Sequence, residues 1–336
     1  MAASLPGALS AHLPAIEEAL QAALSQGPDD LIHISRYVMG WEDAAGNPLR
    51  TGGKRIRPAL CVFGATLFGE RPEAALPGAV AVELVHNFSL VHDEVQDHDA
   101  ERHSRPTVWA LKGEGQAINA GDFLITRAMS ALLDAPGPVS RRIAALSVLN
   151  EAMARMIDGQ WHDIAFESRE SVSPEEYLAM VRGKTGALLG APLAMGALLA
   201  GAPPDQAAAL QEWGETVGLA FQVQDDYLGI WGDPNQTGKS NVNDIVRHKK
   251  TLPIVHGLAG AHAEAIRAAY ANAVVSETDV QDVVRALDEG GSRTFAKEEG
   301  ERLVARANAM LASFELPAEA RQQLREIGAY LVDRDR

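Results

Sequence analysis

The sequence predicts a large all-helical fold, on three observations. Hydrophobic residues make up 46% of the chain but aromatic residues only 5%, so the core must consist mainly of small and straight-chain side chains such as Ala and Leu. Apolar residues recur at the helical period along most of the 336 residues. No convincing run of alternating strand residues is present. We therefore expect residues 1–336 to form one all-α domain.

Each helix is predicted from its own apolar period, and glycine and proline mark most of the joints. The clearest start is Ser173-Pro174-Glu175-Glu176, where an N-cap precedes a proline and two acids in the first turn. The expected helices cover residues 8–25, 29–40, 55–69, 72–98, 116–134, 138–167, 174–200, 204–231, 250–273, 277–289 and 293–335.

The charge and the cysteine content exclude several classes of protein. A net charge of −15 does not suit a protein that binds duplex nucleic acid, since phosphate recognition needs clustered cations. Cys61 is the only cysteine, which excludes a disulfide within the chain and a cysteine-rich zinc site. The N-terminus lacks the basic region of a signal peptide and carries Glu17 and Glu18 early. These features predict a cytoplasmic protein.

One uncharged segment has the length of a membrane span. It runs from Thr185 to Pro204 and is about 20 residues long, which is enough to cross a bilayer. It is, however, rich in Ala and Gly, contains Pro192, and has few bulky apolar side chains. We expect a buried helix of a large helical protein rather than a transmembrane helix.

A mostly apolar helix ends in a run of charged residues between Leu90 and Trp109. Asp93 and Asp97 are four residues apart, so on a helix they share one face, whereas Glu94 is turned by about 100°. Two carboxylates on one face suit a hard divalent cation such as Mg²⁺, which accepts one or two carboxylates together with phosphate oxygens. The alternative is a solvated helix end.

A second acidic site follows much later in the chain. Gln222, Asp225 and Asp226 come at the end of another apolar helix, which Gly229 and Gly232 interrupt. If the two acidic sites faced each other, they would form a metal-binding cage for a polyphosphate. The alternative is an exposed pair of aspartates.

Candidate phosphate-binding cations are scattered along the chain, and several lie beside Gly or Pro, where loops place functional groups. Each one alone is more often a surface charge. They are Lys54, Arg55 and Arg57 in TGGKRIRP, Arg102 after the first acidic site, Lys184 in RGKTG, Lys239 in TGKS, and Arg247, Lys249 and Lys250 in RHKKT. TGKS does not complete a nucleotide-binding P-loop, because five residues rather than four separate Gly232 from Gly238.

Taken together, these motifs resemble those of the trans-isoprenyl diphosphate synthases, also called polyprenyl synthetases. The matching segments, in family order, are GGKRIRP, DEVQD at the first aspartate-rich motif DDxxD, KTG, FQVQDD and GKSNVNDIVRHKKTLP. The resemblance implies helices packed round a deep central cavity, and usually a homodimer.

The resemblance also implies a reaction with small-molecule substrates. An allylic diphosphate (dimethylallyl, geranyl or farnesyl) loses pyrophosphate to give a carbocation, isopentenyl diphosphate attacks it, and a proton is removed. Mg²⁺ and nearby cations would stabilise the leaving group, and an apolar cavity would exclude water from the carbocation. An apolar helix that ends in acids and then bases serves both needs.

Residue roles follow from the matching positions. Mg²⁺ would be bound by Asp93, Asp97, Asp225 and Asp226. The allylic diphosphate would be held by Arg102, Lys184 and Lys239, and isopentenyl diphosphate by Lys54, Arg57, His86 and His103. The residues expected to act near the reacting carbon are Lys184, Thr185 and Gln222. The closing C-terminal region would contribute Lys249.

The chain departs from the family pattern in both acidic motifs and in a motif that follows the first. Glu94 replaces the second acid of the first motif, and Gly229 replaces the third acid of the second. The family motif RRGxPT is here Arg102 to Thr107, with His103 in place of the second arginine. Because His103 is a weaker, pH-dependent cation, we expect weaker binding of isopentenyl diphosphate that improves at lower pH, and Arg105 is a possible substitute.

Product length depends on the helix that carries the first motif. Phe88 lies five residues before Asp93 with the small Ser89 next to it, an arrangement that resembles geranylgeranyl diphosphate synthases and implies a C20 product. The alternative is that Phe88 is an ordinary core residue.

Two other functions remain open at this point. One is an impaired regulatory subunit of the same fold that needs a catalytic partner. The other is a class I terpene cyclase, which needs no isopentenyl diphosphate site and is disfavoured by GGKRIRP.

Overall fold

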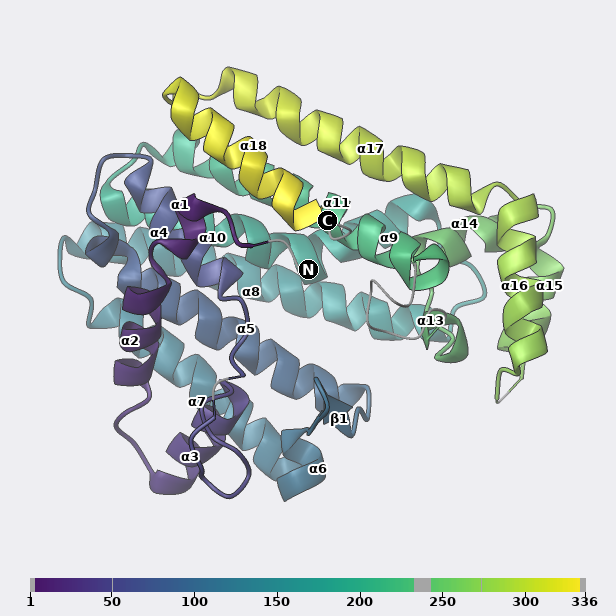
Figure 1. The fold of residues 1–336 in the computed structure, drawn as a ribbon, viewed down its shortest axis with the longest axis horizontal. Helices are drawn as coiled ribbons and strands as arrows, with labels where there is room; N and C mark the ends of the chain where they lie inside the picture. Colours follow the sequence, from purple (N-terminus) through teal and green to yellow (C-terminus); the bar gives the residue numbers. More distant parts are fainter. Residues whose placement is uncertain (1–3, 50, 233–242, 273, 333–336) are drawn as a thin grey trace. The chain divides into compact units, whose positions relative to one another are not determined.

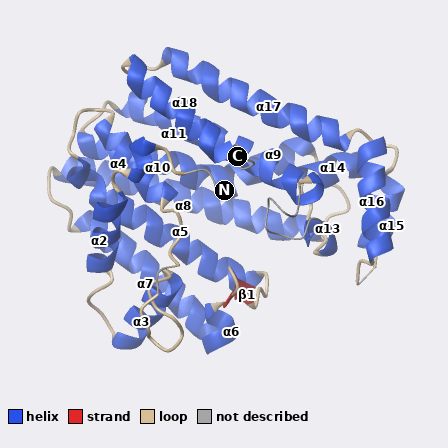
Figure 2. Cartoon of the chain, viewed as in Figure 1, coloured by secondary structure: helices blue, strands red, loops and turns tan. Residues whose placement is uncertain are grey.

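The computed structural model describes residues 4–49, 51–232, 243–272 and 274–332. Helices dominate this part of the chain, as the sequence predicts, and its only strands form one short hairpin (Figure 2). The chain divides into two compact units. The first, here called the N-terminal unit, comprises Leu5–Met153 and Ala191–Gln211, and the C-terminal unit comprises Met1–Ser4, Ala154–Gly190 and Glu212–Arg336. The boundaries fall inside three long helices, and the single domain predicted above stays a prediction.

The N-terminal unit is built around two long neighbouring helices, α5 (Leu76–Gln96) and α7 (Glu114–Leu133), which lie side by side (Figure 1). The other elements are α1 (Gly7–Ser10), α2 (Leu13–Ala23), α3 (Asp29–Val38), α4 (Ile56–Thr66), η1 (Pro72–Ala75), β1 (Glu101–Arg102), β2 (Arg105–Pro106), α6 (Val108–Lys112), and parts of α8 (Val139–Glu167), α10 (Ala187–Ala200) and α11 (Pro204–Trp231).

Small residues allow helices α4 and α10 to pack closely. A Cβ on Gly64 would overlap the backbone of Leu193, and one on Gly196 would overlap the backbone of Cys61. The Ala- and Gly-rich composition of the uncharged segment therefore serves close helix packing. By length and composition, the described stretches Pro72–Gln96 and Pro174–Ala200 would suffice to cross a membrane. Since 67% and 72% of their most apolar windows are buried inside the structure, they behave as core helices, as predicted.

The C-terminal unit contains the remaining helices. They are α9 (Pro174–Val181), the π-helix η2 (Arg182–Gly186), α13 (Asn243–Val246), α14 (Leu252–Ala259), α15 (Ala263–Tyr270), α16 (Glu277–Glu289), α17 (Ser292–Met310), η3 (Leu311–Ser313) and α18 (Ala318–Val332). The predicted start of α9 is confirmed, because Ser173 and Glu176 form a capping box. One core cluster joins α9, α11 and α14 through residues such as Tyr177, Leu219 and Leu252.

Several predicted boundaries were wrong for identifiable reasons. The helix expected over 250–273 is two helices, because the chain extends at Gly260 between α14 and α15. The helix expected over 293–335 stops before Pro317, which lacks an N–H and disfavours helical backbone in the preceding residue. The hairpin β1–β2 has strands of two residues each, too short to show an alternating pattern.

Candidate active site

The first acidic site occupies the last turn of α5. The amide of Asp97 donates to the carbonyl of Asp93 at 2.8 Å, so the two aspartates stay one helical turn apart and partly exposed, as the spacing predicts. Glu94 instead is 7% exposed. Burial raises the pKa of Glu94 to about 7, against the attraction of Arg102 and with help from the negative charges of Asp93 and Asp99. The residue that departs from the family motif therefore lies off the face shared by the two aspartates.

The hairpin after α5 carries Arg102 and His103. Arg102 pairs in register with Arg105, and its Nε lies 3.8 Å from Oε1 of Glu94. The two residues at the tip, His103 and Ser104, are exposed and have φ of 50° and 59°. Positive φ at both central residues is the pattern of a type I′ turn, in which Gly or Asn is favoured. Ser104 therefore holds a strained conformation where the family motif has Gly.

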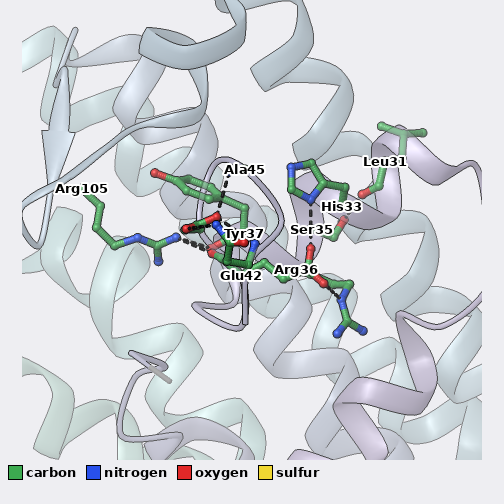
Figure 3. Close-up of polar contacts among 10 residues, drawn as sticks. Leu31, His33, Ser35, Arg36, Tyr37, Glu42, Ala45 and Arg105 are labelled. Atoms are coloured by element: carbon green, nitrogen blue, oxygen red, sulfur yellow. Dashed lines mark hydrogen bonds and ion pairs between the residues drawn. The ribbon is translucent and has the colours of Figure 1, made fainter. Parts of the chain in front are cut away.

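Arg105 does not lie at the hairpin tip with His103. Its Nη2 donates to the carbonyls of Tyr37 and Glu42 at 3.1 and 2.9 Å, and the guanidinium stacks 4.1 Å from the centre of the Tyr37 ring (Figure 3). The hydroxyl of Tyr37 in turn donates to the carbonyl of Pro106 at 2.6 Å. Arg105 thus anchors the hairpin to α3, and the suggestion that it substitutes for the missing arginine at position 103 receives no support.

Glu42 fixes the loop that follows α3. Its carboxylate accepts hydrogen bonds from His33 at 2.9 Å and from Arg36 (Figure 3). Burial favours the protonated acid, but these hydrogen bonds outweigh it and hold the pKa of Glu42 below its usual value. The ion pairs of Glu42 therefore tie the loop whose carbonyl binds Arg105 back to α3.

Of the residues predicted to bind isopentenyl diphosphate, Arg57 at the start of α4 and His86 on α5 lie in contact, whereas His103 lies at the hairpin tip. Arg57 Nη1 lies 3.2 Å from Nε2 of His86. Burial, together with the positive charges of Arg57, Arg102 and Arg55, lowers the pKa of His86 well below its usual value. His86 is therefore neutral and accepts the hydrogen bond from Arg57. Lys54 is exposed at the end of the preceding loop.

Arg55, one of the three cations of this motif, has a structural role. It is 6% exposed, and its guanidinium donates to Glu17 at 3.1 Å and to Glu83 at 3.0 Å. A third bond, of 3.0 Å, reaches the carbonyl of Met39. Arg55 also adopts a left-handed backbone, with φ of 51°. These bonds fix the loop that presents Lys54, a role the motif alone does not reveal.

The two chain-length residues lie on α5 as the sequence predicts. Phe88 is buried and packs edge-on against the His92 ring, with 4.8 Å between ring centres. The Ser89 hydroxyl donates to the carbonyl of His86 at 2.7 Å, so this side chain turns back onto its own helix. Whether Phe88 limits the product stays a prediction.

In the C-terminal unit, Lys184 and Thr185 lie inside the π-helix η2. Lys184 Nζ forms an ion pair with Asp163 of α8. Thr185 Oγ1 donates to Oε1 of Gln222 on α11 at 3.3 Å. The three residues expected to act near the reacting carbon therefore lie together. Asp163 was not expected from the sequence.

The carboxylate of Asp226 accepts hydrogen bonds from three groups of the protein. It is 3% exposed and accepts from the Tyr177 hydroxyl, from Gln222 Nε2 at 3.0 Å and from the Leu252 amide at 3.1 Å. Burial raises its pKa to about 7, although these three hydrogen bonds favour the charged form. Its neighbour Asp225 is partly exposed. Of the two aspartates, Asp225 is therefore the more exposed.

The second motif has Gly229 in place of its third acid, but another aspartate lies close to this position. A Cβ on Gly229 would lie 3.1 Å from Oδ2 of Asp244 on α13. A carboxylate therefore approaches this position from another segment, although residue 229 has no side chain.

The remaining predicted cations differ in placement. Lys249 follows α13 and is partly buried, and its carbonyl accepts a bond from Tyr270 at 3.1 Å. Lys250 donates to the carbonyls of Phe166 and Arg169, so it caps the end of α8. Lys239 lies outside the described residues. Among the residues that are described, no three His, Cys, Asp or Glu side chains are close enough to hold a metal ion by themselves.

Comparison with known proteins identifies the family of this chain. The polyprenyl synthetase family model matches residues 41–287. (2E,6E)-Farnesyl diphosphate synthase of Mycobacterium tuberculosis H37Rv is 44% identical over 308 residues, which cover 90% of this chain and 85% of that protein. The crystal structure of polyprenyl synthetase from Streptomyces coelicolor A3(2) has a TM-score of 0.90 and 39% identity, covering 97% of this chain and 98% of that one.

A third relative has a structure with ligands. Geranylgeranyl pyrophosphate synthase from Corynebacterium glutamicum, complexed with isoprenyl diphosphate and magnesium, has a TM-score of 0.83 and 26% identity, covering 99% of this chain and all (100%) of that one. The family match covers well over half of this chain and contains both acidic sites and all the predicted substrate residues. The chain therefore belongs to the polyprenyl synthetase family and is a prenyltransferase with the all-α fold of that family.

Proposed function

We propose that this chain is a magnesium-dependent trans-prenyl diphosphate synthase. It condenses isopentenyl diphosphate with an allylic diphosphate, releases pyrophosphate, and forms C20 geranylgeranyl diphosphate. The observation that carries the proposal is the contact of Thr185 with Gln222 beside Lys184. These residues come from two separate sequence motifs, and both motifs resemble parts of one catalytic site.

In the proposed reaction, Lys184 stabilises the leaving group, and Thr185 and Gln222 stabilise the carbocation. The C–O bond of the allylic diphosphate breaks, and pyrophosphate leaves with the electron pair near the ammonium group of Lys184. The remaining carbocation lies beside Oγ1 of Thr185 and Oε1 of Gln222, whose negative dipole ends stabilise it. The double bond of isopentenyl diphosphate then forms the new C–C bond, and loss of a proton completes the product.

The acidic residues suit Mg²⁺. Asp93 and Asp97 offer carboxylate oxygens from one helix face, and magnesium usually takes only one or two carboxylates together with phosphate oxygens. Asp225 offers a further partly exposed carboxylate. When bound, the ion would neutralise the charge of the leaving pyrophosphate. Asp226 uses its oxygens on three protein donors, and we propose that it orients Gln222 instead.

A product assay tests the reaction and its alternatives. Purified protein is incubated with Mg²⁺, isopentenyl diphosphate and dimethylallyl, geranyl or farnesyl diphosphate, and the products are identified by mass. We expect a C20 diphosphate. An end product of C15 would match the farnesyl diphosphate synthase relative instead. Hydrocarbon would indicate a class I cyclase, and a folded, magnesium-binding protein without any product would indicate a regulatory subunit.

Phe88 carries the proposal of a C20 product. Phe88→Ala removes a buried ring from α5 and should allow products longer than C20. The matched control is Phe63→Ala on α4, which removes another buried ring and should leave product length unchanged. If Phe88→Ala gives the same product as the unmodified protein, Phe88 is an ordinary core residue.

His103 supports a prediction about affinity. An exposed imidazole gains its positive charge toward acid pH, so the KM for isopentenyl diphosphate should fall as the pH decreases from 8 to 6. His103→Ala should lose this dependence. Identical KM profiles in the two proteins would contradict the role of His103.

We further propose a cytoplasmic homodimer. The family resemblance implies the dimer, and α8 supports it with a row of exposed apolar residues within the C-terminal unit, Ile157, Trp161 and Ile164. Trp161 is 72% exposed, which is unusual for so large an apolar side chain in a monomer. Sedimentation equilibrium of the unmodified protein and of Trp161→Lys tests this, because a dimer formed through α8 should dissociate in the variant.

A further inference from the structure

The π-helix η2 is the unusual backbone feature of the C-terminal unit. It spans Arg182–Gly186 and interrupts a run that is otherwise α-helical, from α9 to α10. A π-turn is rare and is usually kept at functional sites, because it is less stable than the α-helical alternative. Contacts with neighbouring helices must therefore stabilise the π-helical backbone of η2. Two groups of contacts do so, one through backbone and one through charge.

The backbone contacts leave no room for side chains. On α8, a Cβ on Gly159 would lie 2.8 Å from the Met180 carbonyl and overlap the amide of Lys184. A Cβ on Gly183 would lie 2.5 Å from the carbonyl of Arg155. On α11, a Cβ on Gly218 would lie 2.9 Å from Cα of Gly186. The π-helix is therefore enclosed between α8 and α11 at close range.

The charged contacts centre on Glu215 of α11, which is 5% exposed. Arg155 of α8 donates to both of its oxygens, at 2.5 and 2.9 Å, and Arg182, the first residue of η2, approaches at 3.4 Å. One buried carboxylate thus joins α8, η2 and α11. A bidentate arginine–carboxylate pair of this kind fixes the relative orientation of the two side chains as well as their distance.

The same face of α11 also touches the reacting groups. Glu215, Gln222 and Asp226 are separated by seven and four residues, so they lie in one row along the helix. Gln222 contacts Thr185 at 3.3 Å and donates to Asp226 at 3.0 Å. Helix α11 therefore contacts the π-helix at its start, through Glu215 and Arg182, and near its end, through Gln222 and Thr185.

We propose that Glu215 is a positioning residue, which holds η2 in its π-helical form through Arg155 and Arg182 and so aligns Lys184 and Thr185. The inference rests on the proposed function for its kinetic consequence. Without the carboxylate, two neighbouring guanidinium groups would repel each other, and Arg182 at the start of η2 would lose its charged tie to α11. A return to α-helical winding would rotate Thr185 away from Gln222 and Lys184 away from Asp163.

The first experiment is hydrogen–deuterium exchange in Glu215→Gln. The matched control is Glu212→Gln, on the same helix, which removes an exposed pair with Arg306. We expect amides of residues 182–186 to exchange at least about tenfold faster in Glu215→Gln than in the unmodified protein or the control. Equal exchange in the two variants would overturn the proposal. If Glu215→Gln does not fold, Arg182→Lys serves in its place, since it keeps the Arg155–Glu215 pair intact.

The second experiment measures the effect on catalysis. Glu215→Gln should lower kcat by roughly tenfold to hundredfold and leave the KM for isopentenyl diphosphate unchanged. If Glu215 acts through Thr185, the loss should be smaller in a Thr185→Ala background than in the unmodified background. A normal kcat, or strictly additive losses, would overturn the positioning role. If the unmodified protein forms no elongated diphosphate, the proposed function fails, and the exchange comparison still decides whether Glu215 holds η2.

Discussion

Two predicted substrate lysines, Lys54 and Lys184, lie close in the chain to ion clusters that have opposite charges at their centres. Beside Lys54 the centre of the cluster is a cation, because Arg55 binds the carboxylates of Glu17 and Glu83. Beside Lys184 the centre is an anion, because Glu215 binds two arginines.

The two clusters also differ in what supports them. The loop that carries Lys54 is held to α2, α5 and the end of α3 by the three bonds of Arg55, alongside the close backbone contact of Thr51 and Gly52 with Gly40. The π-helix that bears Lys184 depends on shape as well, since glycines bring the backbones of α8 and α11 against it. We therefore expect loss of the central charge to be most damaging near Lys54, and added atoms to be most damaging near Lys184.

The largest expected effect is that of Arg55→Met. This change leaves the Glu83 carboxylate, whose side chain is 6% exposed, without its cation. Breaking a buried ion pair from one side typically costs about 3–5 kcal/mol, because the remaining charge is buried and uncompensated. Urea unfolding should show this loss in the free energy of unfolding.

The control for Arg55→Met is Glu17→Gln. The side chain of Glu17 is 35% exposed, and glutamine can still accept hydrogen bonds from Arg55 and Trp41. We expect a cost of about 1 kcal/mol or less. Equal losses from the two substitutions would mean that burial of Glu83 does not determine the stability of this loop.

The sequence predicts the local features of both regions. The spacing of Asp93 and Asp97, the N-cap at Ser173 and the buried character of α10 follow from neighbouring residues alone, and the structure confirms them. These features depend on helical periodicity and on hydrogen bonds within one turn.

The ion clusters could not be predicted, because their partners are distant in sequence. GGKRIRP presents three similar cations, and only Glu17 and Glu83 distinguish Arg55 as the buried one. The π-helix likewise depends on contacts with α8 and α11, whose contacting residues are distant from it in sequence. A weak signal for Glu215 was available, since it is an acid in an apolar stretch between Gly214 and Gly218, which are spaced for close helix packing.

The second expected effect tests the importance of shape near Lys184. Gly159→Ala adds a methyl group that overlaps the amide of Lys184, so α8 and η2 must separate. Overpacking of this kind costs about 1–3 kcal/mol, which exceeds the gain of up to about 1 kcal/mol in helix propensity. We expect a lower free energy of unfolding and a lower kcat.

Gly115→Ala on α7 is the matched control. A Cβ at this position meets no atom within 4 Å, so alanine should stabilise the helix by about 0.5–1 kcal/mol. If Gly159→Ala behaves in the same way, the close approach of α8 to η2 is not needed to hold Lys184.

The smallest expected effect concerns pH in the region of Lys54. Burial and the charges of Arg57, Arg102 and Arg55 lower the pKa of His86 in the folded protein, so the unfolded chain binds a proton at His86 more readily. His86 therefore contributes stability above its unfolded pKa of about 6.5, and this contribution is lost as the pH falls toward the folded pKa. Below pH 6, the unmodified protein should lose stability relative to His86→Gln, whose side chain does not titrate, by at most about 1.4 kcal/mol per pH unit.

Chemical denaturation of both proteins between pH 5 and 8 measures this difference, and the other titrating groups cancel in the comparison. Parallel stability curves would show that folding does not change the pKa of His86. The charges around Arg55 would then produce no net positive potential at His86. A difference that grows toward acid pH would show that the loop presenting Lys54 lies in a positive field. Such a field would attract a diphosphate, and the bound anion would in turn raise the pKa of His86. Pyrophosphate should therefore reduce the acid-side loss in the unmodified protein and have less effect in His86→Gln.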